Sequence, residues 1–245
     1  MNWTDEAIVL SVRPHGETAA IAELLTREHG RHLGYVHGGR SRRLRPVLQT
    51  GNHVDVTWRG RLPDQLGHLG IELRRGFAGE AMAGAAPGPL DALSSIAVLT
   101  RLLPERDPHP ALYEVTLFVL GFLDEPSIWP ALVVRWELAL LAELGFGLEL
   151  EVCAATGSND QLIYVSPKTG RAVSASAGEP YKDRLLPLPG FLAGRARGPV
   201  AAADVAAGMA LTGYFLESRV LGPQGMGLPE VRARLVAHMT WQPLR

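Results

Sequence analysis

The sequence contains very little cysteine and lysine, and it has no long hydrophobic run. Its 245 residues include one cysteine, Cys153, which excludes a disulfide scaffold and a zinc site made of cysteines from one chain. The longest apolar run, residues 115–123, is about half the roughly 20 residues that a membrane-spanning helix needs. The first ten residues lack the basic region and apolar run of a secretory signal. We therefore expect a cytoplasmic protein with no membrane partner.

Motifs of catalysis and cofactor binding are also missing. The chain contains no P-loop, no H-E-x-x-H zinc motif and no G-x-S-x-G nucleophile elbow. Six of the eight histidines lie within residues 15–68, but their spacing matches no zinc template. His29, His32 and His37 could still converge in space, so a metal-dependent enzyme remains as the weakest hypothesis. We interpret the histidines as turn and surface residues, and we expect a protein that is not an enzyme and takes no small-molecule substrate.

Short alternating segments separated by glycine turns predict a small β-barrel at the front of the chain. Within residues 52–59, Val54, Val56 and Trp58 point one way, so Trp58 is predicted to lie in the core rather than to stack on bases. Residues 20–26 fit a strand or a helix by pattern alone. The other predicted strands are residues 6–13, 33–36, 52–59 and 69–73.

Helical patterns dominate after an Ala-, Gly- and Pro-rich linker at residues 78–89. Residues 153–194 lose the helical period and are rich in Gly and Pro, which predicts an irregular insert. We therefore predict an α+β chain of several domains. Its expected parts are a barrel at 1–80, a first helical part at 81–152, the insert at 153–194 and a second helical part at 195–245.

Arginines gather near the front of the chain although the net charge is only −1. Residues 27–45 carry six arginines against one acidic residue, Glu28. Like charges at such close spacing are unfavourable unless an anion neutralises them, and phosphate groups do so with release of counterions. Arg59 and Arg61 extend this surface. The predicted nucleic-acid-binding residues are Arg27, Arg31, Arg40, Arg42, Arg43, Arg45, Arg59 and Arg61. A solvated surface loop is the alternative interpretation, and a role for Tyr35 in stacking stays open.

Arg135 is the second charged feature, because its helical neighbours three and four positions away are apolar. An arginine on an apolar helix face needs an anionic partner. One interpretation is an internal partner among the carboxylates Glu137, Glu143, Glu149 and Glu151. The other is a partner-binding residue that receives the terminal carboxylate of an incoming chain.

Several segments resemble the RecO family of bacterial recombination mediators. They are EAIVLSVRPHGE, TREHGR, GGRSR, LQTGNHVDVTWRGRL, WELALLAELGFGLELEVCAATG and YVSPKTGRAVS, in the order of the family. The resemblance implies an OB-fold over residues 1–80 and a helical domain after it. It also implies binding of single- and double-stranded DNA, annealing of complementary strands, and loading of RecA together with RecR, in the cytoplasm at the nucleoid. The acidic C-terminal tail of single-stranded-DNA-binding protein is a further implied partner, with Arg135 in the helix that receives it.

The insert departs from the pattern of the family, in which many members hold zinc with two C-x-x-C pairs. Here the first pair is Cys153 and Thr156, and the second is Ser174 and Ala177. One thiolate cannot close a tetrahedral zinc site. We therefore expect a degenerate zinc-finger-like insert, with no metal and no other cofactor.

The leading hypothesis is a DNA-binding recombination mediator in DNA repair. The alternative is a protein-interaction adaptor whose arginines bind acidic partner segments rather than DNA. Residues 81–150, with three arginines against nine acidic residues, show that charge is segregated along the chain and fit contacts of that second kind.

Overall fold

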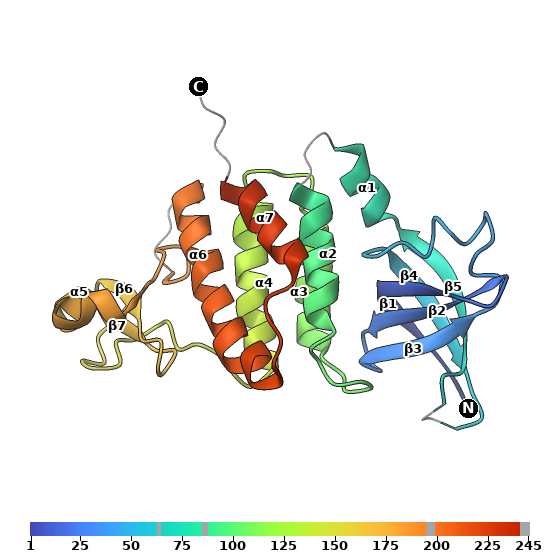
Figure 1. Ribbon diagram of the computed structural model, residues 1–245, viewed down its shortest axis with the longest axis horizontal. Coiled ribbons are helices and arrows are strands. Elements are labelled where there is room, and N and C mark those ends of the chain that lie inside the picture. The colour runs from blue at the N-terminus through green and yellow to red at the C-terminus, as the bar shows by residue number, and fades with distance from the viewer. Residues whose placement is uncertain (63–64, 85–87, 195–198, 241–245) are drawn as a thin grey trace. The chain divides into compact units, whose positions relative to one another are not determined.

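The computed structural model describes residues 1–62, 65–84, 88–194 and 199–240, and it divides into two compact units, Met1–Asp124 and Glu125–Arg245. Figure 1 shows strands in the first part of the chain and mostly helices after it. This composition confirms the predicted α+β class. Among the described residues, no helix has the length and apolar character needed to cross a bilayer. The predicted boundaries at residues 80, 152 and 194 stay predictions.

The first unit begins with a closed five-stranded barrel in the strand order β1-β2-β3-β5-β4. All neighbours pair antiparallel except β3 and β5, which pair parallel at Tyr35 and His68. This order and closure are those of an OB-fold, as expected. Residues 20–26 therefore belong to a strand. The strands are β1 (Asn2–His15), β2 (Ala19–Thr26), β3 (Arg31–Val36), β4 (His53–Arg59) and β5 (His68–Arg75).

Alternation along the strands fills the barrel. Val54, Val56 and Trp58 of β4 point inward, and the Trp58 side chain is 1% exposed, which confirms its predicted place in the core. Its Nε1 donates to the carbonyl of Leu66 at 3.2 Å. Gly67, at φ +63°, leaves room for this ring, since a Cβ there would lie 2.2 Å from Nε1. The core of the barrel is thus built around one indole.

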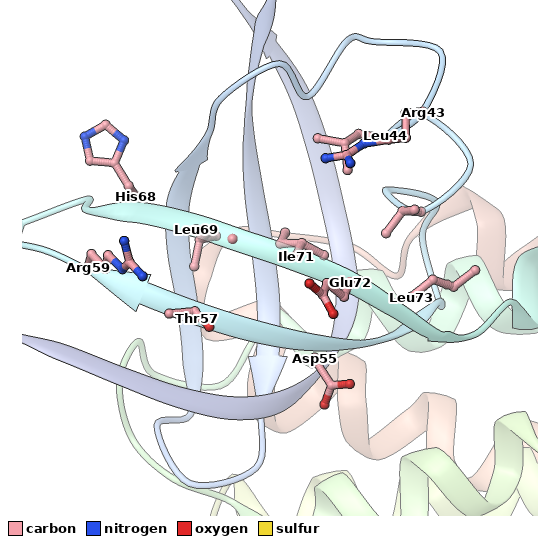
Figure 2. Close-up of a pocket in the computed structure, with 12 residues that line it drawn as sticks. Arg43, Leu44, Asp55, Thr57, Arg59, His68, Leu69, Ile71, Glu72 and Leu73 are labelled. Atoms are coloured by element: carbon pink, nitrogen blue, oxygen red, sulfur yellow. The ribbon is translucent and has the colours of Figure 1, made fainter.

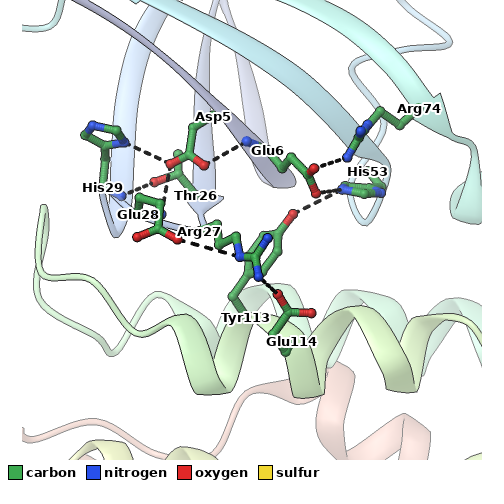
Figure 3. Close-up of polar contacts among 10 residues, drawn as sticks. All are labelled: Asp5, Glu6, Thr26, Arg27, Glu28, His29, His53, Arg74, Tyr113 and Glu114. Carbon is green, nitrogen blue, oxygen red and sulfur yellow. Dashed lines mark hydrogen bonds and ion pairs between the residues drawn. The ribbon is translucent and has the colours of Figure 1, made fainter.

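Among its described residues, the first unit also contains helices α1 (Phe77–Ala83), α2 (Gly88–Thr100) and α3 (Pro110–Leu120). The segment predicted as a linker begins with α1, which is rich in the strong helix former alanine; residues 85–87 lie outside the described part. Polar contacts tie α3 to the barrel (Figure 3). Tyr113 and His53 lie 3.1 Å apart between Oη and Nε2. Burial lowers the pKa of His53 and raises that of Tyr113.

The second unit packs three helices and carries the insert. Helix α4 (Trp129–Glu143) packs on α6 (Ala202–Phe215), and α6 packs on α7 (Glu230–Thr240). A π-helical segment η2 (Leu216–Leu221) and a 3₁₀ turn η3 (Gly222–Gln224) extend α6. The insert holds a three-stranded sheet in the order β7-β6-β8. Its elements are β6 (Leu162–Val165), β7 (Ala172–Ser174), α5 (Ala175–Gly178), η1 (Glu179–Arg184) and β8 (Leu186–Pro187).

A buried ion pair links helices α4, α6 and α7 of the second unit. Arg232 of α7 donates to both carboxylate oxygens of Glu137 in α4, at 2.8 Å each, and to the carbonyl of Met209 in α6. Thr212 of α6 also donates to Glu137. Glu137 is fully buried and Arg232 is 4% exposed, so neither charge has water as a substitute partner. Gly213 makes room for the guanidinium, because a Cβ there would lie 2.8 Å from Nη1.

We expect Arg232→Met to destabilise the second unit by about 3–5 kcal/mol, because it leaves the Glu137 carboxylate buried without its cation. The double variant Glu137→Leu with Arg232→Met should recover most of that loss, since no charge remains buried. Urea unfolding followed by circular dichroism measures both. A double variant as unstable as the single one would show that the pair does not act as a unit.

Candidate nucleic-acid interface

A groove along β4 and β5 brings together arginines that are far apart in the sequence. It is a hollow of about 760 Å³, and both Arg43 and Arg59 line it. Because β3 pairs with β5 only near Tyr35, the loop between β3 and β4 covers the barrel beyond that point. Figure 2 shows this loop with Arg43 and Leu44 above β5, and Arg59 and His68 near the start of that strand. We call this hollow the β4–β5 groove.

The groove continues past Arg59 and His68, which also line a second hollow of about 710 Å³ together with Arg61 and Tyr35. Tyr35 packs at right angles to His68, with ring centroids 5.3 Å apart, and to His15 at 5.7 Å. Arg59, Arg61 and His68 are exposed. Arg43, Arg59 and Arg61 therefore follow one continuous surface that also carries aromatic rings.

The other arginines of the loop face a separate hollow. Arg40, Arg42 and Arg45 line this space of about 800 Å³, together with residues of β1 and β2. Arg40 is also fixed to the loop between those strands, since its Nη1 donates to the carbonyl of Gly16 at 2.9 Å. The basic loop thus presents Arg43 to one hollow and its neighbours to another.

Two of the predicted arginines are held by carboxylates of their own unit. Arg27 pairs with Glu114 of α3, at 2.9 Å between Nη2 and Oε1 (Figure 3). Arg31 pairs with Glu23 and donates from Nε to the carbonyl of Leu103 at 2.9 Å. Its side chain is only 14% exposed. These two side chains fasten the barrel to the helical part of the unit, and the structure does not bring them to the groove.

Acidic residues mark one part of the groove. Asp55 and Glu72 both line it, and Asp55 pairs with Arg74 at 3.2 Å. An extended polyanion is repelled by carboxylates and attracted by guanidinium groups. Arg43, Arg59 and Arg61 therefore favour phosphates on this surface, whereas Asp55 and Glu72, which line the same groove, oppose them. Sequence reasoning did not single out His68; its only signal was the polar face of an alternating strand.

Arg135 of α4 is exposed, and its Nη2 donates to the carbonyl of Phe191 at 3.0 Å. The guanidinium also lies 6.0 Å from the centre of the Phe191 ring. Of the carboxylates predicted as internal partners, Glu137 pairs with Arg232 and Glu149 pairs with Arg171. A backbone carbonyl thus anchors Arg135 and leaves its charge open to an anion.

The residues at the four expected zinc-ligand positions do not fit a zinc ion. Cys153 is 1% exposed, and its Sγ lies 3.4 Å from the Oγ of Ser174. Burial raises the pKa of the thiol, but hydrogen bonds from Ser174, Thr156 and two backbone N–H groups outweigh burial and lower it to about 6. One thiol and two hydroxyls are a poor donor set for zinc. Within the described residues, no group of three or more His, Cys, Asp or Glu side chains is placed to hold a metal.

Comparison with known proteins assigns the chain to a family. Residues 1–77 match the family model described as Recombination protein O N terminal, and residues 92–225 match Recombination protein O C terminal. The DNA repair protein RecO of Methylobacterium nodulans is 55% identical over 241 residues, which cover 97% of each chain. That of Methylorubrum populi is 56% identical over 249 residues, which cover 99% of this chain and 100% of the relative. The chain therefore belongs to the RecO family of DNA repair and recombination proteins.

Proposed function

We propose that this chain is a non-enzymatic recombination mediator that binds DNA through the β4–β5 groove and its continuation to Arg61. The observation that carries the proposal is the alignment of Arg43, Arg59 and Arg61 with Tyr35 and His68 on one continuous barrel surface. Guanidinium groups bind phosphates through a planar fork, and exposed aromatic rings stack on bases. The RecO relatives, named as DNA repair proteins, support this assignment.

Both single- and double-stranded DNA fit this kind of surface. Phosphate contacts position a strand without reading its sequence, so binding is only weakly sequence-dependent. The separate hollow lined by Arg40, Arg42 and Arg45 provides additional cationic surface on the same barrel. Arg27 and Arg31 are not part of the proposed interface, because carboxylates of the chain already neutralise them.

We expect the double variant Arg43→Ala with Arg59→Ala to weaken binding of single-stranded DNA and to reduce the salt slope of log K by about 1.4, that is about 0.7 for each lost phosphate contact. Fluorescence anisotropy with a labelled oligonucleotide at several salt concentrations measures both quantities.

The matched control is Arg184→Ala, an exposed arginine of the insert, which should bind as the unmodified protein does. The variant Arg42→Ala with Arg45→Ala tests the separate hollow. An unchanged affinity and salt slope in the Arg43/Arg59 variant would contradict the groove assignment.

Annealing of complementary strands needs no catalytic residue in this proposal. A cationic surface that neutralises two strands lowers their repulsion and raises their local concentration. We expect annealing of complementary oligonucleotides without a nucleoside triphosphate, and a slower rate in the Arg43/Arg59 double variant. A fluorescence-quenching assay with a labelled pair measures the rate. Strict dependence on ATP would contradict this mechanism.

The second unit is proposed to bind protein partners. Arg135 is anchored by the Phe191 carbonyl. Its guanidinium group suits the terminal carboxylate of an acidic tail, such as that of single-stranded-DNA-binding protein. RecR is the proposed partner in loading RecA, in the cytoplasm at the nucleoid. The insert is proposed to be held without zinc or any other cofactor, by its small sheet and by the hydrogen bonds of Cys153.

We expect Arg135→Ala to weaken binding of a short acidic peptide with a free C-terminal carboxylate by about tenfold, the scale of one charge-assisted hydrogen bond. Oligonucleotide affinity should not change. Isothermal titration with the peptide and with its C-terminal amide measures this. Equal loss of peptide and oligonucleotide binding would instead indicate a shared arginine surface, as in an adaptor that binds any acidic partner.

A further inference from the structure

Three aromatic rings form a parallel stack at the end of the barrel where β1 begins and β4 ends. Trp3 and Trp58 are paired across these two strands, with ring centroids 5.8 Å apart and an angle of 10° between the planes. His29, in the turn after β2, covers Trp3 at 4.0 Å and 8°. We call Trp58, Trp3 and His29 the ring stack. It begins inside the core and ends on the surface, because Trp58 is buried while the His29 side chain is 35% exposed.

The outermost ring of the stack is fixed by a buried carboxylate. The Nδ1 of His29 lies 2.8 Å from the Oδ2 of Asp5, as Figure 3 shows. Asp5 also accepts from the backbone N–H groups of Glu6 at 2.8 Å and Glu28 at 2.9 Å, and its side chain is 4% exposed. Because these two N–H groups fix the Asp5 carboxylate, the carboxylate in turn fixes the orientation of the His29 imidazole. A preorganised ring loses little entropy when a ligand stacks on it.

A pocket of about 600 Å³ lies beside the ring stack. Trp3, His29 and His32 line it, together with Pro108 and Arg106. His32 stands at right angles to both indoles, with centroids 5.1 Å and 5.6 Å away. Burial lowers the pKa of His32 to about 4, with further contributions from Arg106 and His29. The His32 ring is therefore an uncharged aromatic wall of the pocket at neutral pH.

Arg106 supplies positive charge at this pocket. It is one of two described non-glycine residues with a positive φ, at +61°, in the loop between α2 and α3. Its backbone N–H donates to the carbonyl of Arg31 at 2.9 Å, which holds this strained turn against β3. Glu28 is the carboxylate at the pocket, and Arg27 lies 3.6 Å from it. The pocket thus combines aromatic walls with a guanidinium group.

The pocket adjoins the proposed DNA surface. Met1 and Asn2 line both this pocket and the hollow that contains Arg61 and Tyr35. A strand that follows the β4–β5 groove to Arg61 therefore reaches the pocket across the first residues of β1.

We propose that this pocket takes one unpaired nucleobase of a bound DNA strand, stacked on His29 as the next ring of the stack, with a neighbouring phosphate at Arg106. The inference rests on the proposed DNA binding and adds a base-binding site to it. A base has a flat apolar face that can stack on His29, and it is linked to a phosphate that complements Arg106. A paired base in a duplex is not available to stack in this way.

The test compares a thymidine oligonucleotide with an abasic strand of the same length, which has the phosphates but no bases. We expect His29→Ala to lower affinity for the thymidine strand by about fivefold or more, the scale of one lost stacking contact, and to leave the abasic strand unchanged. His29→Phe keeps a ring and should retain most of the affinity. His37→Ala, another exposed histidine of the barrel, is the matched control.

A 2-aminopurine placed in turn at each position of the thymidine strand reports stacking directly. We expect its fluorescence to be quenched on the unmodified protein and restored with His29→Ala. Equal affinity and equal quenching in both proteins would overturn the base pocket. A different result would assign the pocket to a peptide instead of a base. In that case an acidic peptide with a terminal phenylalanine would quench tryptophan fluorescence of the unmodified protein but not of His29→Ala, and both DNA strands would bind the two proteins equally. Failure of the proposed DNA-binding surface would give a different result. The affinity for the thymidine strand and for the abasic strand would then be the same in the unmodified protein and in the Arg43→Ala, Arg59→Ala double variant.

Discussion

The parallel contact between β3 and β5 is the constraint on which the surface of the first unit depends. It joins the strands at Tyr35 and His68, and it closes the barrel. Gly34 makes the contact feasible, since a Cβ there would lie 2.3 Å from Cγ of Leu69. Beyond this single pairing the loop between β3 and β4 covers the core. The same closure therefore places the aromatic pair Tyr35 and His68 at one end of the β4–β5 groove and the basic loop between β3 and β4 over the other end.

The arginines of the barrel fall into two groups, those that pair with carboxylates of the chain and those that are exposed to solvent. Arg27 and Arg31 pair with carboxylates of the same unit, and Arg31 does so at a position where an unpaired charge would be costly. Arg43, Arg59 and Arg61 are exposed on hollows where a water-solvated cation costs little. Only the second group keeps its full attraction for a polyanion, because a charge already paired offers a weaker field to a ligand. Proximity in the sequence is therefore a poor guide to which arginines act together.

The elements that depend on local pattern could be predicted, and those that depend on long-range pairing could not. Alternation along β4 gave both the strand and the buried place of Trp58. The partner of Arg27 is Glu114, and no local pattern connects them. His29 looked like a turn residue because the ring on which it stacks, Trp3, is distant in the sequence. Arg135 donates a hydrogen bond to the Phe191 carbonyl of the insert. The sequence pattern predicted only carboxylate partners for this arginine.

A surface that binds the phosphates of a strand but only one of its bases favours strand annealing. Bases that are stacked on protein or buried in it cannot pair, so extensive base contacts would oppose annealing. In the proposed binding mode, the guanidinium groups of the β4–β5 groove contact the DNA backbone, and the ring stack ends in one exposed imidazole. Under this proposal, most bases of a bound strand stay free to pair with a complement, and the single stacked base limits sliding of the strand. Weak recognition of bases is thus a requirement for annealing rather than a defect of the site.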